Sequence, residues 1–258
     1  MVPGEYVDAV ISALFDDAVE PKIAVVGVGG AGGNVVTALH DASLDGVETV
    51  AVNTDPGGLT RTAAHTKVLL RPPDDADPVE GAAAAAADAD VPLREAIACD
   101  IAFIVAGLGG SAGTGAAPVV ADIAKSAGAV AIGIAILPLS MEGRDEVARA
   151  GLVRFKDAAD TVVTVDNNSL LKVAEAMPFH EAAALVTKMV QAIIEGVLSH
   201  LRRSYYSTLV EEVESVAREV EADLGGPFDV QIVTSPTVEA SWDLGPVGFG
   251  DDGFIGLR

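Results

Sequence analysis

The sequence predicts an α/β fold: a doubly wound, mostly parallel sheet with helices on both faces, followed by helices and a flexible tail. Short apolar, β-branched runs such as KIAVVGV (22–28) and AVAIGIAIL (129–137) alternate with segments of helical periodicity. Glycine-rich stretches directly follow two of the apolar runs, as in the strand-to-helix turns of such sheets. Any ligand is therefore expected at the carboxyl ends of the strands.

Strands are expected where apolar runs are short, over 22–28, 47–55, 67–70, 99–107, 129–137 and 160–167. Helices are expected where apolar residues recur at helical spacing, over 5–19, 34–42, 81–98, 114–128, 142–158, 180–203 and 207–226, with a turn and short helix at 55–65. Pro92 is expected to break the alanine-rich helix into two pieces, and Gly128 to end the helix before it.

Four segments are expected along the chain. Residues 1–20 form an N-terminal helix, and 21–200 form the main α/β domain with a long core helix. Residues 201–234 form a helical extension with one last strand at its end, and 235–258 form a flexible, acidic, glycine-rich tail.

The charge of the chain excludes several classes of partner. Its 258 residues contain 38 Asp and Glu but only 16 Lys and Arg, a formal net charge of −22. Nucleic acids and anionic membranes require clustered basic residues, so neither is expected. A solvated acidic surface of this kind is typical of a halophilic protein.

The N-terminus and the single cysteine indicate an ordinary cytoplasmic protein. The segment MVPGEYVDAV lacks the features of a signal peptide, and no uninterrupted apolar stretch reaches about 18 residues. We therefore expect a cytoplasmic location and no direct membrane insertion. Cys99, the one cysteine, is expected to be a small buried hydrophobe.

The first glycine-rich loop, GVGGAGGN (27–34), fits G-x-G-x-x-G through Gly27, Gly29 and Gly32. Free N–H groups at the start of the following helix, together with the helix dipole, can bind a phosphate that glycine allows to come close. A tight strand-to-helix turn without a ligand produces the same pattern.

The second loop, GLGGSAGTG (107–115), repeats this arrangement after the strand at 99–107. Two such loops at one sheet edge are hard to explain by turn geometry alone. No lysine follows either loop, so neither is a Walker P-loop, and backbone amides would hold the phosphates. We expect Thr114 to cap the following helix rather than to contact the ligand.

With these loops in place, the chain resembles the tubulin/FtsZ superfamily, on its bacterial and archaeal FtsZ side. GLGGSAGTGAAPVVADIAK is similar to the signature loop of that family, usually GGGTGTG. GVGGAGGN, NTD (53–55), PLSMEG (138–143) and DNNSLLKV (166–173) also match, in order and at the expected strand ends, so the resemblance covers about residues 20–200.

The resemblance implies GTP or GDP with Mg²⁺ in this cleft. The residues that would line the first loop are Gly29, Gly30 and Asn34. Those that would wrap the phosphates through their N–H groups are Gly107, Gly110, Ser111, Ala112 and Gly113. The ribose would meet Pro138 and Glu142, and the base would meet Asn167 and Phe179. No catalytic and no metal-ligating residue of the chain itself is predicted.

Several positions depart from the family pattern. Asp74 and Asp75 fall in the loop expected near the γ-phosphate, where they would either repel it or point into solvent as surface acids. Ala112 replaces a threonine, and Glu146 stands where the family has an arginine near the nucleotide. Ala183 replaces an acid that reads guanine, which weakens the expected guanine specificity.

Two further departures concern hydrolysis and assembly. The family completes its active site with an acidic loop from a neighbouring subunit, but the corresponding segment SHLRRSYYS (199–207) contains no acid. The usual C-terminal domain is also reduced to a helix and tail. Self-stimulated GTP hydrolysis and ordinary filament growth are therefore not expected.

Three hypotheses follow for the function. The first is a guanine-nucleotide-binding protein of cell division or the cytoskeleton, with weak or absent hydrolysis, which regulates or partners a full-length FtsZ or itself. The second is a pseudo-GTPase scaffold with an empty or repurposed cleft. The third is a dinucleotide enzyme using Gly27, Gly29, Gly32 and Asp55. The tail ending DDGFIGLR is either a docking segment for a protein partner or a loose terminus.

Overall fold

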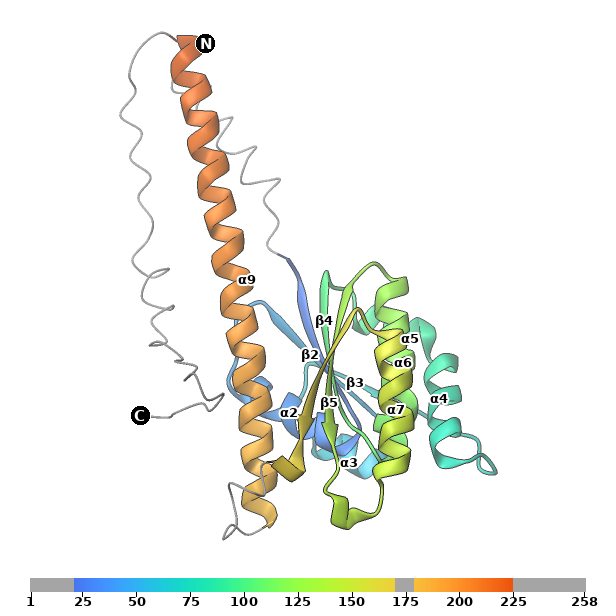
Figure 1. Ribbon diagram of the computed structural model, residues 1–258. Helices are drawn as coiled ribbons and strands as arrows, with labels where there is room; N and C mark the ends of the chain where they lie inside the picture. Colours follow the sequence, from blue (N-terminus) through green and yellow to red (C-terminus); the bar gives the residue numbers. More distant parts are fainter. Residues whose placement is uncertain (1–20, 170–178, 225–258) are drawn as a thin grey trace. The chain divides into compact units, whose positions relative to one another are not determined.

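A computed structural model describes residues 21–169 and 179–224 of the chain (Figure 1). Its centre is a six-stranded sheet in the order β3-β2-β1-β4-β5-β6, in which every neighbouring pair is parallel. The strands are β1 (Ile23–Val28), β2 (Val47–Asn53), β3 (Thr66–Leu69), β4 (Ile101–Gly107), β5 (Val130–Leu137) and β6 (Thr161–Asp166). The doubly wound parallel sheet predicted from the sequence is confirmed.

Helices cover both faces of this sheet. The helices are α2 (Gly29–Asp41), α3 (Pro56–Arg61), α4 (Pro78–Asp88), α5 (Asp90–Ala96), α6 (Ser111–Ser126), the 3-10 turn η1 (Ser140–Glu142), α7 (Asp145–Ala158) and α9 (Phe179–Leu224). Figure 1 shows α4, α5, α6 and α7 on one side of the sheet and α2 on the other. A hydrophobic core cluster joins residues of β1, β2 and β4 to the inner faces of α4 and α6.

Two glycines bring the helices of the larger layer close together. A Cβ added at Gly115 of α6 would overlap the carbonyl of Val79 in α4, and one added at Gly151 of α7 would overlap the methyl group of Thr114. Glu80 of α4 and Arg154 of α7 also form an ion pair of 2.8 Å. These contacts fix the position of α6 against α4 and α7, and with it the position of the α6 N-terminus at the sheet edge.

The main difference from the predicted elements lies at the helix starts. The sequence predicted helices from residues 34 and 114, but α2 begins at Gly29 and α6 at Ser111. Both glycine-rich loops are thus largely helical, which moves the helix N-termini towards the strand ends. Similarly, α4 begins at Pro78 rather than at residue 81, because Asp77 caps it through the N–H groups of Val79 and Glu80.

The predicted break near Pro92 occurs, but at Ala89, three residues earlier. Pro92 itself lies in the first turn of α5, where its missing N–H group is tolerated.

The two helices predicted over 180–203 and 207–226 are a single helix, so that prediction was wrong. No proline or glycine interrupts α9 between Val197 and Leu224. The hydroxyls of Ser207 and Thr208 donate to the carbonyl of Ser204, at 2.9 and 3.0 Å, so they are satisfied without leaving the helix. SHLRRSYYS is therefore helical and forms no loop.

Residues 20–196 form one compact unit, and the described part of α9 from Val197 onward belongs to a second. The predicted helix at 5–19, the predicted strand at 228–234 and the tail lie outside the described residues. The domain boundaries given above stay predictions.

One part of α9, Ala184–Tyr205, is long and apolar enough to cross a membrane by length and composition, with a mean hydropathy of 1.2. Val186, Val190 and Ile194 in it are buried, at the spacing of one helix face. Core helices of globular domains meet the same criterion, so this segment is weak support for a membrane span.

Candidate functional site

The two glycine-rich loops lie side by side at the carboxyl edge of the sheet. β1 and β4 are neighbours, with Gly27 opposite Val105 and Val28 opposite Ala106. The strand order reverses between them, and such switch points are where open α/β sheets bind ligands.

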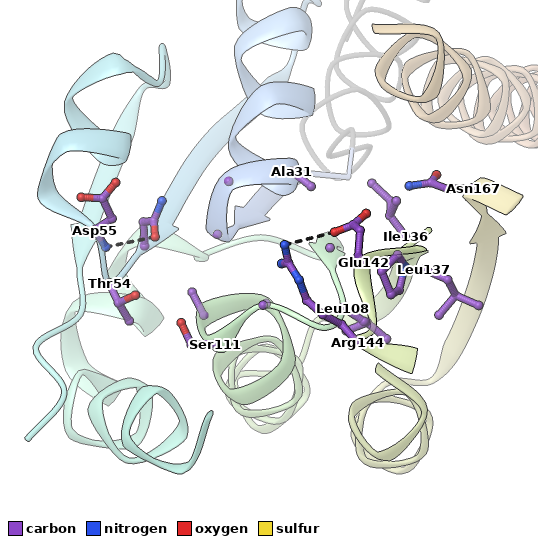
Figure 2. Close-up of a pocket in the computed structure, with 18 residues that line it drawn as sticks. Ala31, Thr54, Asp55, Leu108, Ser111, Ile136, Leu137, Glu142, Arg144 and Asn167 are labelled. Carbon is purple, nitrogen blue, oxygen red and sulfur yellow. Dashed lines mark hydrogen bonds and ion pairs between the residues drawn. The ribbon is translucent and has the colours of Figure 1, made fainter. Parts of the chain in front are cut away.

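A cavity of about 350 Å³ occupies this place (Figure 2). It is lined by Gly29, Gly30, Ala31, Asn53, Thr54, Asp55, Gly107, Leu108, Gly110, Ser111, Ala112, Gly113, Ile136, Leu137, Pro138, Glu142, Arg144 and Asn167. Its volume lies within the range of small-molecule sites.

The helices that point into the cavity begin without a cap. Neither α2, after Val28, nor α6, after Gly110, has a side-chain hydrogen bond at its N-cap, and neither has an acidic residue in its first turn. The first N–H groups of a helix have no intrahelical acceptor, and the helix dipole adds positive potential there. The cavity is thus floored by two sets of N–H groups suited to an anion.

Several glycines of these loops are required by the protein's own packing. Gly29 and Gly109 have φ of 74° and 94°, values that favour glycine. A Cβ at Gly32 would overlap the carbonyl of Val105, and one at Gly113 would overlap the carbonyl of Gly107. These glycines set how closely the helices approach the strands.

Gly30 and Gly110 are different, because the protein's packing does not require them to be glycine. A Cβ added at either would meet no atom within 4 Å, and neither residue has a positive φ. Both line the cavity. Because glycine has no side chain, the two helix starts have open space next to an accessible backbone, as a ligand bound by amide groups would require.

Thr114 does not cap α6, contrary to the prediction. It lies within the helix, fully buried, and its Oγ1 accepts the Gly109 N–H at 2.8 Å. The N-cap is Gly110. Thr114 therefore stabilises the loop at Gly109, the residue with the left-handed conformation, because its hydroxyl accepts an N–H group that would otherwise have no partner.

The β5 side of the cavity carries the charged pair Glu142 and Arg144. Glu142 Oε1 accepts the Leu139 N–H at 3.1 Å, and Oε2 lies 3.1 Å from Arg144 Nη2. Glu146, the charge reversal noted in the sequence, is exposed and outside the lining. Arg144, two residues before Glu146, places a cation in the cavity lining.

Asn167 and Asn168 follow β6 and have separate roles. Asn167 lines the cavity, and its Oδ1 is buried with no hydrogen-bond partner among the described residues. Asn168 ties β6 to the β5 loop, since its Oδ1 accepts the Ser140 N–H at 2.9 Å and its Nδ2 donates to the Pro138 carbonyl at 3.3 Å. An orphaned acceptor such as Asn167 Oδ1 calls for a donor from a ligand or water.

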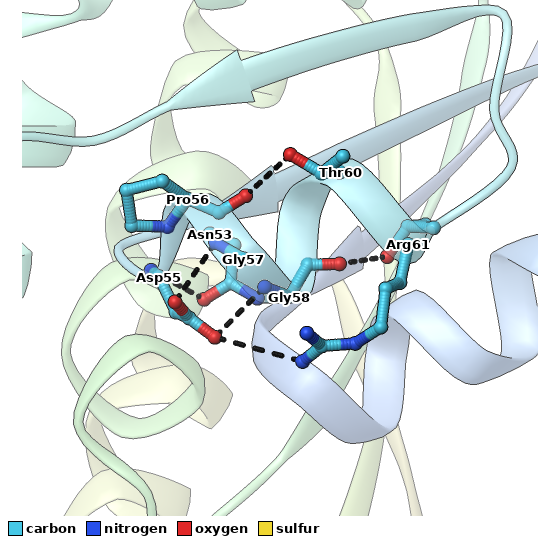
Figure 3. Close-up of polar contacts among 8 residues, drawn as sticks. Asn53, Asp55, Pro56, Gly57, Gly58, Thr60 and Arg61 are labelled. Atoms are coloured by element: carbon cyan, nitrogen blue, oxygen red, sulfur yellow. Dashed lines mark hydrogen bonds and ion pairs between the residues drawn. The ribbon is translucent and has the colours of Figure 1, made fainter.

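The β2 side is closed by Asn53, Thr54 and Asp55. Asp55 caps α3 through the N–H groups of Gly57 and Gly58, at 3.0 and 2.8 Å, and lies 3.9 Å from Arg61 Nη2 (Figure 3). Asn53 Oδ1 accepts the Asp55 N–H at 3.1 Å. The Asp55 carboxylate is thus occupied in holding the loop.

Ten of the twelve residues predicted for the site line the cavity. Those that line the cavity are Gly29, Gly30, Gly107, Gly110, Ser111, Ala112, Gly113, Pro138, Glu142 and Asn167. Phe179 begins α9, but its side chain lies outside the described residues, as does that of Ala183. Asn34 is exposed on α2 and does not line the cavity.

Asp74 and Asp75 are exposed and absent from the cavity lining. Of the two interpretations left open from the sequence, the structure favours surface acids.

The predicted nucleotide site did not include the lining residues Ala31, Asn53, Thr54, Asp55, Leu108, Ile136, Leu137 and Arg144. Most of them adjoin a predicted strand end, so the rule that ligands bind at carboxyl edges could have found them. Arg144 had no such signal, since its position depends on the η1 turn and on Gly143, whose φ is 65°.

A second cavity, of about 690 Å³, lies at the amino ends of the strands. Near it the hydroxyl of the buried Thr49 lies 3.1 Å from His40 Nδ1 and 2.8 Å from His65 Nδ1, and the two rings pack edge to face. Cys99 also lines it, half-buried, and burial raises the pKa of its thiol to about 11. The described residues that line this second cavity include no glycine-rich loop and no helix start, so it does not share the anion-binding character of the first cavity.

Comparison with known proteins agrees with this arrangement. The family described as "Tubulin/FtsZ family, GTPase domain" matches residues 22–175. Cell division protein FtsZ of Methanothermobacter thermautotrophicus is 39% identical over 184 residues, 68% of this chain and 48% of that protein. Cell division protein FtsZ 2 of Halobacterium salinarum is 35% identical over 190 residues, 70% of this chain and 48% of that protein.

Solved structures give the same result. The empty FtsZ dimer of M. jannaschii has a TM-score of 0.66 at 34% identity, over 74% of this chain and 58% of that chain. CetZ from Methanosaeta thermophila, at 22% identity and a TM-score of 0.57, shows the likeness of fold alone. The chain spans about half the length of the curated relatives it matches. It belongs to the Tubulin/FtsZ family through the GTPase domain of that family.

Proposed function

We propose that this chain binds GTP or GDP in the cavity between the N-termini of α2 and α6. The observation that carries the proposal is the pair Gly30 and Gly110, which leave open space at two uncapped helix starts. Backbone N–H groups there would hold the phosphates, as at other helix-terminal anion sites. Membership of a GTPase-domain family supports guanine nucleotide over other phosphates.

The remaining lining residues fit the other parts of a nucleotide. Glu142 and Pro138 would meet the ribose, where a carboxylate can accept hydroxyl hydrogens. Asn167 Oδ1, buried and without a hydrogen-bond partner among residues 21–169 and 179–224, would accept an N–H of the base. Guanine offers such donors, although Asn167 alone would discriminate less than a pair of groups would.

The described residues do not fit a Mg²⁺ ion held by the protein itself. They contain no group of three or more His, Cys, Asp or Glu placed to bind a metal. The lining carboxylates are already bonded, Asp55 to helix N–H groups and Glu142 to Leu139 and Arg144. Any Mg²⁺ would therefore come bound mainly to the phosphates and water, as this ion often does.

Hydrolysis by the isolated chain is proposed to be slow or absent. Both lining carboxylates already accept N–H groups of the chain itself, and SHLRRSYYS is helical and has no acid. The absence of a positioned base typically costs a factor of about 10² to 10⁴ in rate.

We further propose that such a chain acts in cell division or the cytoskeleton as a partner or regulator of a full-length FtsZ, to which it presents its nucleotide face. Phosphate release from GTP should then rise only when a subunit with its own acidic loop is added. Equal, low release with and without that subunit would contradict the partner role but not nucleotide binding.

Thermal unfolding with different ligands tests the binding proposal. A ligand at a hundred times its Kd stabilises the folded state by about 2.7 kcal/mol. GTP and GDP should raise the Tm, whereas NAD should not. A response to NAD alone would favour a dinucleotide enzyme, and no response to any nucleotide in molar KCl would favour the scaffold alternative.

A further inference from the structure

We propose that Arg144 binds the nucleotide phosphates in this chain, and that it exchanges the carboxylate of Glu142 for them when the ligand enters. The inference rests on the proposed function and deepens it, because it assigns a role to a residue outside the family pattern. Among the described residues that line the cavity, Arg144 is the sole cation and Asp55 and Glu142 are the anions.

The position of Arg144 follows from the turn before it. Gly143 has a left-handed conformation, with φ of 65°, and directs the chain from η1 into α7. The Arg144 stem then packs against the second glycine loop, since a Cβ added at Gly109 would lie 3.0 Å from Arg144 Cβ and 3.5 Å from Cδ. The guanidinium is thus anchored next to the loop that precedes the N-terminus of α6.

The ion pair between Arg144 and Glu142 joins a more exposed side chain to a less exposed one. Glu142 is 25% exposed and also accepts the Leu139 N–H, whereas the Arg144 side chain is 53% exposed and, within the described part of the chain, pairs with Glu142 alone. Figure 2 shows the two side chains turned toward each other on the same side of the cavity. Because partly exposed ion pairs are weak, Arg144 can leave Glu142 at little cost.

A phosphate is a better partner for this guanidinium than the carboxylate. It carries more charge when it belongs to a di- or triphosphate, and its oxygens accept two parallel N–H bonds from arginine. When Arg144 turns to the phosphates, Glu142 Oε2 loses its partner and can accept a ribose hydroxyl. Phosphate binding and ribose binding would then be coupled through one side chain.

This role does not depend on the arginine position of the family. That position is Glu146 here, exposed and outside the cavity lining. Arg144 is assigned to the phosphates because its stem lies against Gly109 and because its ion pair with Glu142 is weak and can be replaced.

The test is to measure the Kd of GTP, GDP and guanosine for the full chain and for Arg144→Gln, by equilibrium dialysis in molar KCl. Losing a charge-assisted hydrogen bond to phosphate should weaken GTP binding by roughly 10-fold or more, and guanosine binding by less than about 2-fold. Arg144→Lys keeps the positive charge but lacks the paired N–H donors of arginine, so its Kd for GTP should lie between those of the unchanged chain and Arg144→Gln.

Arg154→Gln is the matched control. It removes the same charge from α7, but Arg154 pairs with Glu80 outside the cavity, so its GTP affinity should equal that of the unchanged chain. The proposal is overturned if Arg144→Gln and Arg154→Gln bind GTP equally, or if Arg144→Gln weakens guanosine as much as GTP. Failure of the unchanged chain to bind any of the three ligands would overturn the proposed function as well.

Discussion

The helices of this domain begin in two different ways. At α3 and α4, Asp55 and Asp77 precede a proline and accept two N–H groups each. At α5 and α7 an acid stands in the first turn. At α2 and α6 there is neither a cap nor an acid, and the first residues of both helices line the cavity. Asp55, the cap of α3, borders the same cavity on its β2 side. Negative charge is thus present at the starts of α3, α4, α5 and α7 and missing at the starts of α2 and α6, where an anionic ligand can supply it.

The largest effect is expected from a glycine that packing requires. Gly113→Ala would place a methyl group on the Gly107 carbonyl and separate α6 from β4. Such overpacking against a backbone carbonyl, which cannot move aside as a flexible side chain can, should lower the free energy of unfolding by about 3 kcal/mol. Urea unfolding should show a lower midpoint or no folded protein. A midpoint within error of the unchanged chain would contradict the distinction between packed and open glycines.

Gly110→Asp gives α6 the cap that α3 and α4 have. The carboxylate should stabilise the fold by about 0.5 kcal/mol. At the same time it should weaken GTP binding at least about 100-fold, because it fills the space and repels phosphate. Tm and Kd should therefore both rise, because the fold becomes more stable while the affinity for GTP falls.

Two controls accompany this variant. Gly110→Asn should stabilise the fold similarly but cost less affinity, since it adds bulk without charge. Gly196→Asp, also at an open glycine but in α9, should leave GTP affinity unchanged. If Gly110→Asp keeps full affinity, the start of α6 is not the phosphate site.

Thr114→Val tests the support behind the second loop. It removes the acceptor of the buried Gly109 N–H while keeping the shape of the side chain. An unpaired buried N–H should cost about 1–3 kcal/mol. Thr114→Ser, which retains the hydroxyl, should recover most of the lost stability in the same unfolding measurement.

The smallest effect is expected at a capped helix. Asp77→Ala removes the cap of α4 and should lower stability by about 1 kcal/mol. Asp77 does not line the cavity, so GTP affinity should not change. A large loss of affinity would mean that the loop before α4 takes part in binding.

The sheet and most of the site were predictable from the sequence, because strand periodicity and loops at strand ends are local properties. Gly110 was found in this way, whereas Glu142 was assigned through the resemblance to the family. Arg144 was found in neither way, since its place depends on the left-handed Gly143 and on packing against Gly109. Thr114 was assigned the wrong role, because the sequence does not show that α6 begins three residues before it.

The division of α9 into two helices was wrong for a related reason. Serine and tyrosine near residues 204–207 weaken a helix only slightly when the serine and threonine hydroxyls bond within it.

The central claim is that the uncapped starts of α2 and α6 hold a guanine nucleotide. The most direct measurement is to purify the full chain in molar KCl, denature it and identify any released nucleotide by anion-exchange chromatography, alongside Gly110→Asp. The account predicts GTP or GDP at close to one per chain from the unchanged protein and almost none from Gly110→Asp. Equal amounts of nucleotide from both, or an unchanged protein that carries none and whose Tm does not respond to added GTP, would contradict it.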